Sequence, residues 1–430
     1  MSQAQHIVII GAGQAGFQTA ASLRSEGFAG QITLVGDEPG DPYQRPPLSK
    51  AYLQGKTDAA GLRFRPPDFY ERQQIDRLHG RVLAIDRAAR TLSVAHVSPD
   101  SSVDDDTGTN SSQPLRYDHL VLAMGARNRV PSVTGIGLSG VFGLRSLADA
   151  DALSPQLREG QRVVVVGAGF IGLEFAAVAA QRGLSVDMLE IAARPMARAI
   201  SEPMSAAFDA AHRALGTRLH YGQALAEVLG DAQGRASGVR TSTGAQLDAD
   251  LVVYGIGVQP NIELAQAAGL ALDDGVRVDA QLQTTDPHIS AVGDLVRFPS
   301  PWARTAVRLE SVQNAADQAR HLAARLTGKA NGDYAAVPWF WSDQGEFKLQ
   351  IAGLSEGVDH THVLGDATQR QFAVLCFKGE RLVAVETCNR AVDHMAARKL
   401  LLRGTTPTRA EAEAPDFELK AFEAATRPAT

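Results

Sequence analysis

The chain has 430 residues, of which 44% are hydrophobic and 21% are charged, and its formal net charge is −6. This length predicts two or three domains, and the acidic balance argues against general nucleic-acid binding. The only cysteines are Cys376 and Cys388, which disfavours a secreted disulfide scaffold. The first residues lack a secretory-signal pattern, and no apolar run reaches the roughly 18 residues of a membrane span. We therefore expect a cytoplasmic protein.

A buried strand followed by a glycine turn opens the chain. The segment HIVII (6–10) has the continuous apolar character of a parallel strand, and GAGQAG follows it. We predict a helix over about 14–26 and a second strand over 32–37. This order is typical of a βαβ dinucleotide-binding unit.

The same pattern returns in the middle of the chain. RVVVV begins at residue 162 and is followed by GAGFIG, by a predicted helix to about Arg182 and by the strand 185–190. A single glycine turn could belong to an unrelated α/β fold. Two copies in matching context predict two dinucleotide sites.

Each glycine of such a turn has its own role. The first permits the sharp turn from strand to helix, the second lets the backbone approach a pyrophosphate, and the third allows close packing of helix on sheet. The pyrophosphate is expected at the helix N-terminus, where unpaired N–H groups favour negative charge. These residues are Gly11, Gly13 and Gly16 in the first turn, and Gly167, Gly169 and Gly172 in the second.

An acidic residue ends the second strand of each copy and is expected to accept hydrogen bonds from an adenosine ribose. In the first copy Asp37 is preferred to its neighbour Glu38, and in the second the residue is Glu190. A carboxylate there repels a 2′-phosphate, so Glu190 favours NADH over NADPH, although Arg194 nearby could serve a phosphate. FAD together with NADH would convert hydride pairs into single electrons.

Later segments extend the same architecture. We predict strands within 117–126, 249–261 and 289–294, an amphipathic helix over 311–327, a hairpin around 378–380 and a helix after it. The polar, acidic segment 97–113 is expected to be a disordered loop.

In chain order, the motifs resemble those of one family, the FAD-dependent NADH:ferredoxin reductases of bacterial oxygenase systems (the rhodocoxin reductase and putidaredoxin reductase family). The resemblance covers about residues 6 to 402. The motifs are GAGQAG, PYQRPPLSKAYL (42–53), LAMGAR (122–127), GAGFIGLE (167–174), GIGVQPN (255–261), AVGD (291–294), LESVQNA (309–315) and PWFWSDQ (338–344).

This resemblance implies an α/β, glutathione-reductase-like fold with two Rossmann-type dinucleotide-binding domains and a C-terminal α+β domain. The FAD domain would be discontinuous, formed by 1–114 and 249–329. The NAD domain would be 115–248, and the C-terminal domain 330–430.

The resemblance also implies roles for single residues. Lys50 would lie near the isoalloxazine, where a cation stabilises the negative charge of reduced flavin, and Glu174 would face the nicotinamide. Glu310 and Val312 would lie at the flavin ring, beside a helix N-terminus whose dipole favours the anionic flavin. The further cofactor contacts implied are Ala15, Asp37, Val82, Arg145 and Asp294 for FAD and Gly257 beside the NAD path.

The two tryptophans of PWFW have different expected roles. In the resembling proteins the second lies near the flavin edge where the partner docks, so a role in electron transfer is expected for Trp341. Trp339 is equally well explained as part of the core.

The implied electron acceptor is a two-iron–two-sulfur ferredoxin that feeds a haem monooxygenase or a ring-hydroxylating dioxygenase. Such ferredoxins are typically acidic, and Arg297, Arg304 and Arg308, with no acid between them, are candidate docking residues. Neither a metal site nor a side-chain nucleophile is needed for hydride transfer.

Three other functions are compatible with a dinucleotide-binding chain. A dithiol reductase needs a redox cysteine near the flavin, and PYQRPPLSK contains none, which argues strongly against it. A flavin NADH oxidase and an NADH-sensing flavoprotein resembling apoptosis-inducing factor stay open as alternatives.

Overall fold

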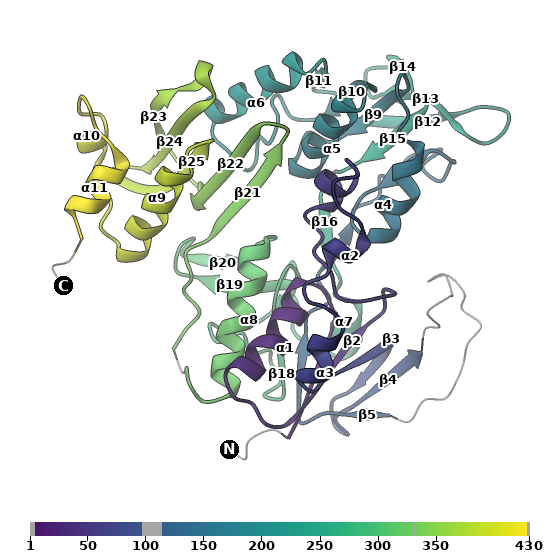
Figure 1. Cartoon of the computed structure of the whole chain (residues 1–430), viewed down its shortest axis with the longest axis vertical. Coiled ribbons are helices and arrows are strands. Elements are labelled where there is room, and N and C mark those ends of the chain that lie inside the picture. The colour runs from purple at the N-terminus through teal and green to yellow at the C-terminus, as the bar shows by residue number, and fades with distance from the viewer. Residues whose placement is uncertain (1–4, 97–113, 331, 428–430) are drawn as a thin grey trace. The chain divides into compact units, whose positions relative to one another are not determined.

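The computed structural model of the chain describes residues 5–96, 114–330 and 332–427, so the predicted disordered loop 97–113 lies outside them. The chain divides into two units (Figure 1). Unit 1 comprises residues 1–44, 62–127 and 259–336, and unit 2 comprises 45–61, 128–258 and 337–430.

Unit 1 is built around a sheet whose strand order is β18-β6-β1-β2-β3-β4-β5. The first five strands of that order are parallel, and β4 and β5 continue it antiparallel. Its helices and strands are β1 (His6–Ile10), α1 (Gln14–Ser25), β2 (Gln31–Gly36), α3 (Asp68–Arg72), β3 (Ile75–Asp86), β4 (Thr91–His96), β5 (Leu115–Arg116), β6 (His119–Leu122), α7 (Glu263–Ala267), β17 (Val276–Arg277), β18 (Ile289–Ala291), β19 (Val296–Ser300), β20 (Thr305–Val307) and α8 (Val312–Leu326).

The core of unit 1 lies between this sheet and its helices. Ile7, Val8 and Ile9 of β1 are fully buried, as expected for a strand covered on both faces. Helices α1 and α8 lie side by side in this unit (Figure 1), and Ala315, Leu322 and Ala323 form the buried stripe of α8. The predicted amphipathic helix 311–327 is confirmed.

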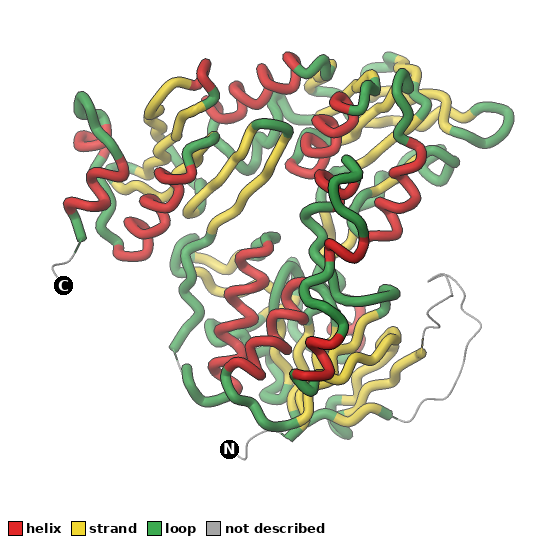
Figure 2. The backbone as a smooth tube through the Cα atoms, viewed as in Figure 1, coloured by secondary structure: helices red, strands yellow, loops and turns green. Residues whose placement is uncertain are grey.

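Unit 2 contains a parallel sheet of order β11-β10-β9-β15-β8 and an antiparallel sheet of order β21-β22-β25-β24-β23. Figure 2 shows the helices of this unit packed along the strands. Its elements are η1 (Leu48–Tyr52), β8 (Val141–Gly143), α4 (Leu147–Leu153), η2 (Ser154–Gln156), β9 (Arg162–Val166), α5 (Phe170–Gln181), β10 (Ser185–Glu190), α6 (Glu202–Ala214), β11 (Arg218–Tyr221), β12 (Leu225–Gly230), β13 (Ala236–Thr241), β14 (Gln246–Asp248), β15 (Leu251–Tyr254), β21 (Trp339–Gln344), β22 (Phe347–Gly353), β23 (His360–Asp366), η3 (Ala367–Gln369), β24 (Gln371–Lys378), β25 (Arg381–Cys388), α9 (Ala391–Arg403), α10 (Arg409–Ala412) and α11 (Leu419–Ala425).

Three short elements fall where the chain passes between the units: α2 (Ala59–Leu62), β7 (Ala126–Asn128) and β16 (Val258–Pro260). The predicted limits of the three domains stay a prediction. In the structure β5 pairs with β4, and β6 pairs with β1 and β18, all within the sheet of unit 1. Strand β15 belongs to the parallel sheet of unit 2.

Both parallel sheets have the order that a Rossmann-type duplication predicts. In each, the strand before the glycine turn lies between the strand that follows the first helix and a later strand, β6 beside β1 and β15 beside β9. The strand order reverses at this point, where dinucleotide folds bind their ligand. The fold class, the two βαβ units and the late hairpin β24–β25 are confirmed.

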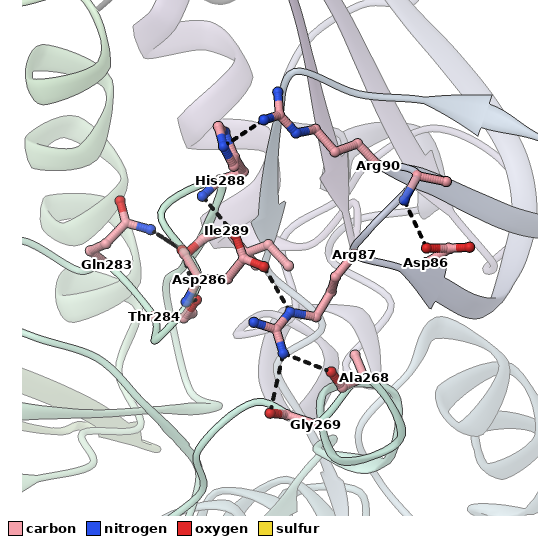
Figure 3. Close-up of polar contacts among 11 residues, drawn as sticks. Asp86, Arg87, Arg90, Ala268, Gly269, Gln283, Thr284, Asp286, His288 and Ile289 are labelled. Carbon is pink, nitrogen blue, oxygen red and sulfur yellow. Dashed lines mark hydrogen bonds and ion pairs between the residues drawn. The ribbon is translucent and has the colours of Figure 1, made fainter.

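An arginine in the turn after β3 joins three segments of unit 1 (Figure 3). Arg87 donates from Nε to Asp286 at 2.7 Å and from Nη1 to the carbonyls of Ala268 and Gly269. Burial alone would raise the pKa of Asp286, but hydrogen bonds from Arg87 and from the backbone of His288 outweigh it and hold that pKa below its ordinary value. This clamp fixes the segment that leads into β18.

No helix in the described part of the chain is long and apolar enough to cross a membrane.

Candidate functional site

The first glycine turn has positions that accept only glycine. Gly11 has a φ of +104°, and a Cβ there would collide with the carbonyl oxygen of Ala123 in the turn after β6. Gly16 faces the carbonyl oxygen of Gly11 in the same way. These close approaches bring the start of α1 against β1 and β6, the neighbouring strands at which the strand order reverses.

The middle glycine of that turn faces open space. A Cβ on Gly13 would meet no atom within 4 Å. Gly13 is also the N-cap of α1, where no side chain caps the helix, whereas Ser311 caps α8 by accepting from the backbone N–H of Asn314. The first N–H groups of α1 therefore lack a side-chain acceptor, which fits a bound pyrophosphate.

The second glycine turn repeats this geometry. Gly167 has a φ of +100° and approaches the carbonyl oxygen of Gly255, while Gly172 packs on the carbonyl oxygen of Gly167. Gly169 is an N-cap without a side-chain hydrogen bond, and its Cβ would meet a single atom, 3.9 Å away. Both turns fit the dinucleotides that the sequence predicts.

The two candidate acids after β2 have different surroundings. The Glu38 carboxylate accepts a hydrogen bond from the Tyr43 hydroxyl. Asp37 is exposed and lies 3.6 Å from Arg81. The preference for Asp37 as the ribose ligand stays a prediction, and its exposure is compatible with it.

Glu190 is held against the second glycine turn. Its two carboxylate oxygens accept the backbone N–H groups of Ala168 at 2.7 Å and Ala192 at 2.8 Å. The Arg194 guanidinium donates to backbone carbonyls instead, those of Ala197 at 3.1 Å and Ile200 at 3.0 Å. The arginine that could have served a 2′-phosphate is thus engaged within its own loop.

Asp294 lies close to the first turn. Gly293, directly before it, approaches the Cβ of Ala15 so closely that a side chain there would meet that atom at 3.0 Å. The N–H of Gly293 donates to Oε1 of the buried Gln318 in α8 at 2.8 Å. The structure therefore brings Ala15 and Asp294, both predicted from the resemblance, to one edge of unit 1.

Glu310 and Val312 flank Ser311, the N-cap of α8. Glu310 is exposed and forms an ion pair with Arg308. The helix begins at Val312, one residue after the start of the predicted range 311–327, and the flavin contact of these residues stays a prediction.

The other cofactor residues implied by the resemblance are distributed over both units. Val82 is half-buried in β3 of unit 1. Arg145, whose carbonyl accepts from Arg45, and Gly257, which is exposed with a φ of +102°, belong to unit 2. Their contacts with FAD and NAD stay predictions.

A buried polar cluster of unit 2 surrounds Glu174 in α5. The Lys50 ammonium lies 2.9 Å from Oε1, and the hydroxyl of Ser342 donates to the same oxygen at 2.7 Å. The hydroxyl of Ser49 donates to Oε2 at 2.5 Å. Glu174 is only 6% exposed, so its charge is balanced inside the protein by one cation and two hydroxyls.

The cluster continues along β21 through alternate residues. Gln344 is buried, donates to the Ser342 hydroxyl at 3.2 Å and pairs through Oε1 with His212 of α6 at 2.9 Å. Burial lowers the pKa of His212. Phe340, the preceding alternate residue, packs against Phe170 at the start of α5, with ring centroids 4.4 Å apart and planes tilted by 39°.

The structure brings together Lys50 and Glu174, both implied by the resemblance, whose roles stay predictions, but the sequence did not point to the side chains that hold them. Ser49 was present in PPLSK, and Ser342 and Gln344 were present in PWFWSDQ. The alternate spacing of Ser342 and Gln344 was the available signal, since in a strand it places both side chains on one face.

Trp339 and Trp341 lie next to each other on β21, with ring centroids 5.5 Å apart. Trp339 also contacts α9, where the Arg398 guanidinium lies 4.4 Å from its ring centroid and His394 lies at 5.6 Å. Both tryptophans are half-buried. The electron-transfer role of Trp341 stays a prediction.

The three candidate docking arginines differ in their partners. Arg308 has only 11% of its side chain exposed and pairs with Glu310 and with Asp274 at 3.5 Å. Arg297 pairs with Asp273 at 3.0 Å. Arg304 is exposed in the turn between β19 and β20.

The two thiols do not form a redox pair. Cys376 and Cys388 are free and fully buried on β24 and β25. Burial raises the pKa of both thiols, to about 11 for Cys388. This disfavours dithiol chemistry, since the reactive form is the thiolate.

The chain matches two family models. Residues 5–319 match the pyridine nucleotide-disulphide oxidoreductase family, and residues 339–423 match the reductase C-terminal family. The second match covers the antiparallel sheet of unit 2 and α9 to α11.

Several characterised proteins are similar over nearly the whole chain. Rhodocoxin reductase of Rhodococcus erythropolis is 48% identical over 415 residues, which cover 96% of this chain and 93% of that protein. The crystal structure of the ferredoxin reductase of the CYP199A2 system from Rhodopseudomonas palustris is 45% identical, with a TM-score of 0.91 over 97% of this chain and 99% of that one. The covalent putidaredoxin reductase–putidaredoxin complex gives 39% identity and a TM-score of 0.91, over 98% of both chains.

The two dinucleotide turns have matching geometry, and a reductase C-terminal domain follows them. Both features point to the same family as the sequence similarities. The chain belongs to the pyridine nucleotide-disulphide oxidoreductase family, as a member of its FAD- and NAD(H)-using ferredoxin reductases.

Proposed function

We propose that this protein oxidises NADH and delivers single electrons to a two-iron–two-sulfur ferredoxin, which in turn serves a haem monooxygenase or a ring-hydroxylating dioxygenase. The observation that carries the proposal is the pair of glycine turns, each with an open middle glycine at an uncapped helix start, in a chain without an available redox thiol. Bound FAD supplies the chemistry that the chain lacks, because flavin accepts hydride pairs and releases electrons singly.

NADH is the proposed donor, in preference to NADPH. Glu190 is fixed by two backbone N–H groups at the end of β10, where the adenosine ribose of the second dinucleotide is expected. A 2′-phosphate would meet this carboxylate, and the donors of Arg194 are turned to the carbonyls of its own loop. Both features disfavour the phosphorylated coenzyme.

Lys50, Glu174 and Trp341 of unit 2 are proposed catalytic residues, and Glu310 of unit 1 is proposed separately as a residue at the flavin ring. The Lys50 ammonium would stabilise negative charge on the reduced isoalloxazine, and Glu174 would face the nicotinamide. Glu174 holds Lys50 at 2.9 Å, so the orientation of the cation depends on this carboxylate. Asp37, Asp294 and Val312 are proposed FAD contacts, as the resemblance to the ferredoxin reductases implies.

The proposed acceptor is recognised partly by charge. Ferredoxins of this type are typically acidic, so an exposed arginine would accelerate their association. Arg304 is the exposed candidate, whereas the charge of Arg308 is balanced by Asp274 and Glu310. We propose a cytoplasmic location, where thiols stay reduced, in agreement with the two free cysteines.

The test uses the purified yellow protein. Anaerobic NADH should bleach the flavin, and catalytic amounts of the protein should then reduce a panel of two-iron–two-sulfur ferredoxins, followed with cytochrome c. One NADH should be consumed for every two ferredoxins reduced. A protein that consumes NADH with oxygen alone, at a rate that no ferredoxin changes, would be a flavin oxidase instead. Slow bleaching that ends in a long-lived charge-transfer complex would indicate an NADH sensor.

A further inference from the structure

The segment that joins β10 to α6 follows Glu190 directly and lies against the second glycine turn. Residues 191–201 form this segment, and it ends at Ser201, the N-cap of α6. The N–H of Met196 donates to the carbonyl of Ala168 within the glycine turn at 2.9 Å. The position of this segment therefore determines the surroundings of Glu190.

One end of segment 191–201 is clamped by a residue from another family domain. Glu386 of β25, in the reductase C-terminal region, is fully buried. Its Oε1 accepts the N–H of Ser201 at 2.8 Å, and its Oε2 accepts the Ser201 hydroxyl at 2.6 Å. Arg194 holds the other side of the same peptide by donating to the carbonyl of Ile200 at 3.0 Å.

The middle of the segment is held from the same antiparallel sheet. Nε2 of Gln344 in β21 lies 3.6 Å from Sδ of Met196. Met196 is buried and has a φ of +50°, a conformation that only surrounding contacts can maintain in a residue with a side chain. Strands β21 and β25 both pair with β22, so one sheet carries both contacts (Figure 1).

A buried carboxylate at this place is costly for the fold alone. Burial raises the pKa of Glu386, even though the Ser201 hydrogen bonds and the charge of Arg194 oppose that effect. An apolar residue would fill the same volume without the desolvation cost. The carboxylate instead provides two directed acceptors for a single residue of the segment beside Glu190.

We propose that Glu386 is a positioning residue for NAD(H): its clamp on Ser201 fixes segment 191–201 and thereby the coenzyme site at Glu190. This inference rests on the proposed function insofar as NADH binds at the second glycine turn. It assigns to the C-terminal region a role in coenzyme binding, in addition to its proposed contact with the electron acceptor.

The test compares Glu386→Ala and Glu386→Gln with a matched control in the purified holoprotein. Thr387→Val is the control, because Thr387 is the next residue of β25, is equally buried and bonds to Gln350 rather than to the segment. Binding of ADP-ribose is measured by calorimetry, and hydrogen exchange is followed in peptides that cover 191–201. Steady-state kinetics with ferricyanide give KM and kcat for NADH.

Glu386→Ala should weaken ADP-ribose binding and raise the NADH KM by about tenfold, the scale of a lost charge-assisted hydrogen bond. It should also speed exchange in 191–201 and leave kcat at saturating NADH and the FAD content close to wild type. Glu386→Gln, which retains one acceptor, should be intermediate, and Thr387→Val should behave as wild type. If Glu386→Ala does not fold, Glu386→Gln and Ser201→Ala decide the question by the same measurements.

Unchanged ADP-ribose affinity in the Glu386 variants would overturn the inference, as would equal losses in Thr387→Val. A parallel fall in kcat and FAD content would also overturn it, because that pattern indicates general damage. The proposed function fails separately, if wild-type protein binds ADP-ribose and is reduced by NADH but reduces no ferredoxin.

Discussion

Ser342 of β21 and Glu174 of α5 are joined by a hydrogen bond of 2.7 Å to the same carboxylate oxygen that pairs with Lys50. The residue before this serine is Trp341, the proposed exit for electrons, and Glu174 is the residue proposed to face the nicotinamide. If both proposed roles hold, neighbouring residues of β21 serve the two half-reactions, Trp341 directly and Ser342 through its hydrogen bond to Glu174.

Replacing Ser342 by alanine should slow flavin reduction by NADH. Without the hydroxyl, Oε1 of Glu174 loses one of its two donors, and the Lys50 ammonium is free to shift. We expect the limiting bleaching rate in anaerobic stopped-flow to fall roughly threefold to tenfold, the effect of about 1 kcal/mol for one hydrogen bond. Ser342→Thr keeps the hydroxyl and should retain most of the rate. Equal impairment of both variants would indicate a packing defect instead.

The first glycine turn offers a separation of cofactor binding from folding. Gly13→Ala should give a folded protein that loses much of its FAD, because the added methyl group meets no protein atom but occupies the space proposed for the pyrophosphate. Gly11→Ala should fail to fold, since its Cβ would collide with the Ala123 carbonyl at a positive φ. Flavin absorbance per polypeptide and circular dichroism measure the two effects. Full FAD occupancy in folded Gly13→Ala would contradict the proposed site.

Coenzyme preference should change at Glu190. Glu190→Gln removes the charge that would repel a 2′-phosphate, so the ratio of kcat/KM for NADH to that for NADPH should fall by about tenfold. We expect the change mainly in the KM values, because the nicotinamide is remote from the adenosine ribose. Arg194→Lys should not improve NADPH use, since Arg194 already donates to carbonyls of its own loop. An NADPH activity that depended on Arg194 would contradict this assignment.

The predictable parts of this protein are those that are local in sequence. The glycine turns, the helix within 311–327 and the late hairpin are predictable because strand, turn and helix patterns are complete within short windows. The contacts Ser342–Glu174 and Glu386–Ser201 join residues 168 and 185 positions apart. Such contacts depend on the packing of β21 and β25, which no local pattern encodes.

The arginines illustrate the same limit for charge. Arg297 and Arg308 have no acid between them in the sequence, which suggested a free basic surface. In the fold, Asp273 and Asp274 come from an earlier turn and pair with them. Linear charge spacing therefore overestimated the positive charge available to a partner.

Arg304 provides the cleaner test of ferredoxin docking. Arg304→Glu should raise the KM for the ferredoxin severalfold at low salt, an effect that shrinks as ionic strength rises. Reduction of ferricyanide, a small acceptor, should not change. Arg308→Glu is a poor test, since it would place a third carboxylate beside Asp274 and Glu310. A loss of ferricyanide activity equal to the loss with ferredoxin would exclude a docking role for Arg304.

The stability of the protein should decrease below neutral pH partly through His119. This side chain is buried in β6 and lies 3.0 Å from the Ser290 hydroxyl. Burial, with a smaller contribution from the charge of Arg325, lowers the pKa of His119 to about 3. The unfolded chain binds a proton at His119 near pH 6.5, and the folded chain does not. The contribution of this histidine to the free energy of unfolding is therefore fully present above that pH and is lost as the pH falls toward 3.

One such proton changes the free energy of unfolding by about 1.4 kcal/mol per pH unit between those two values. His119→Gln, which can still hydrogen-bond to Ser290 but does not titrate, should reduce the slope of urea-unfolding free energy against pH by close to one proton between pH 6 and 5. The remaining slope should include His212 and His394, whose pKa values burial also lowers. The same substitution at His362, a half-exposed position of β23, is the control. An unchanged slope in His119→Gln would mean that this histidine accepts its proton in the folded state.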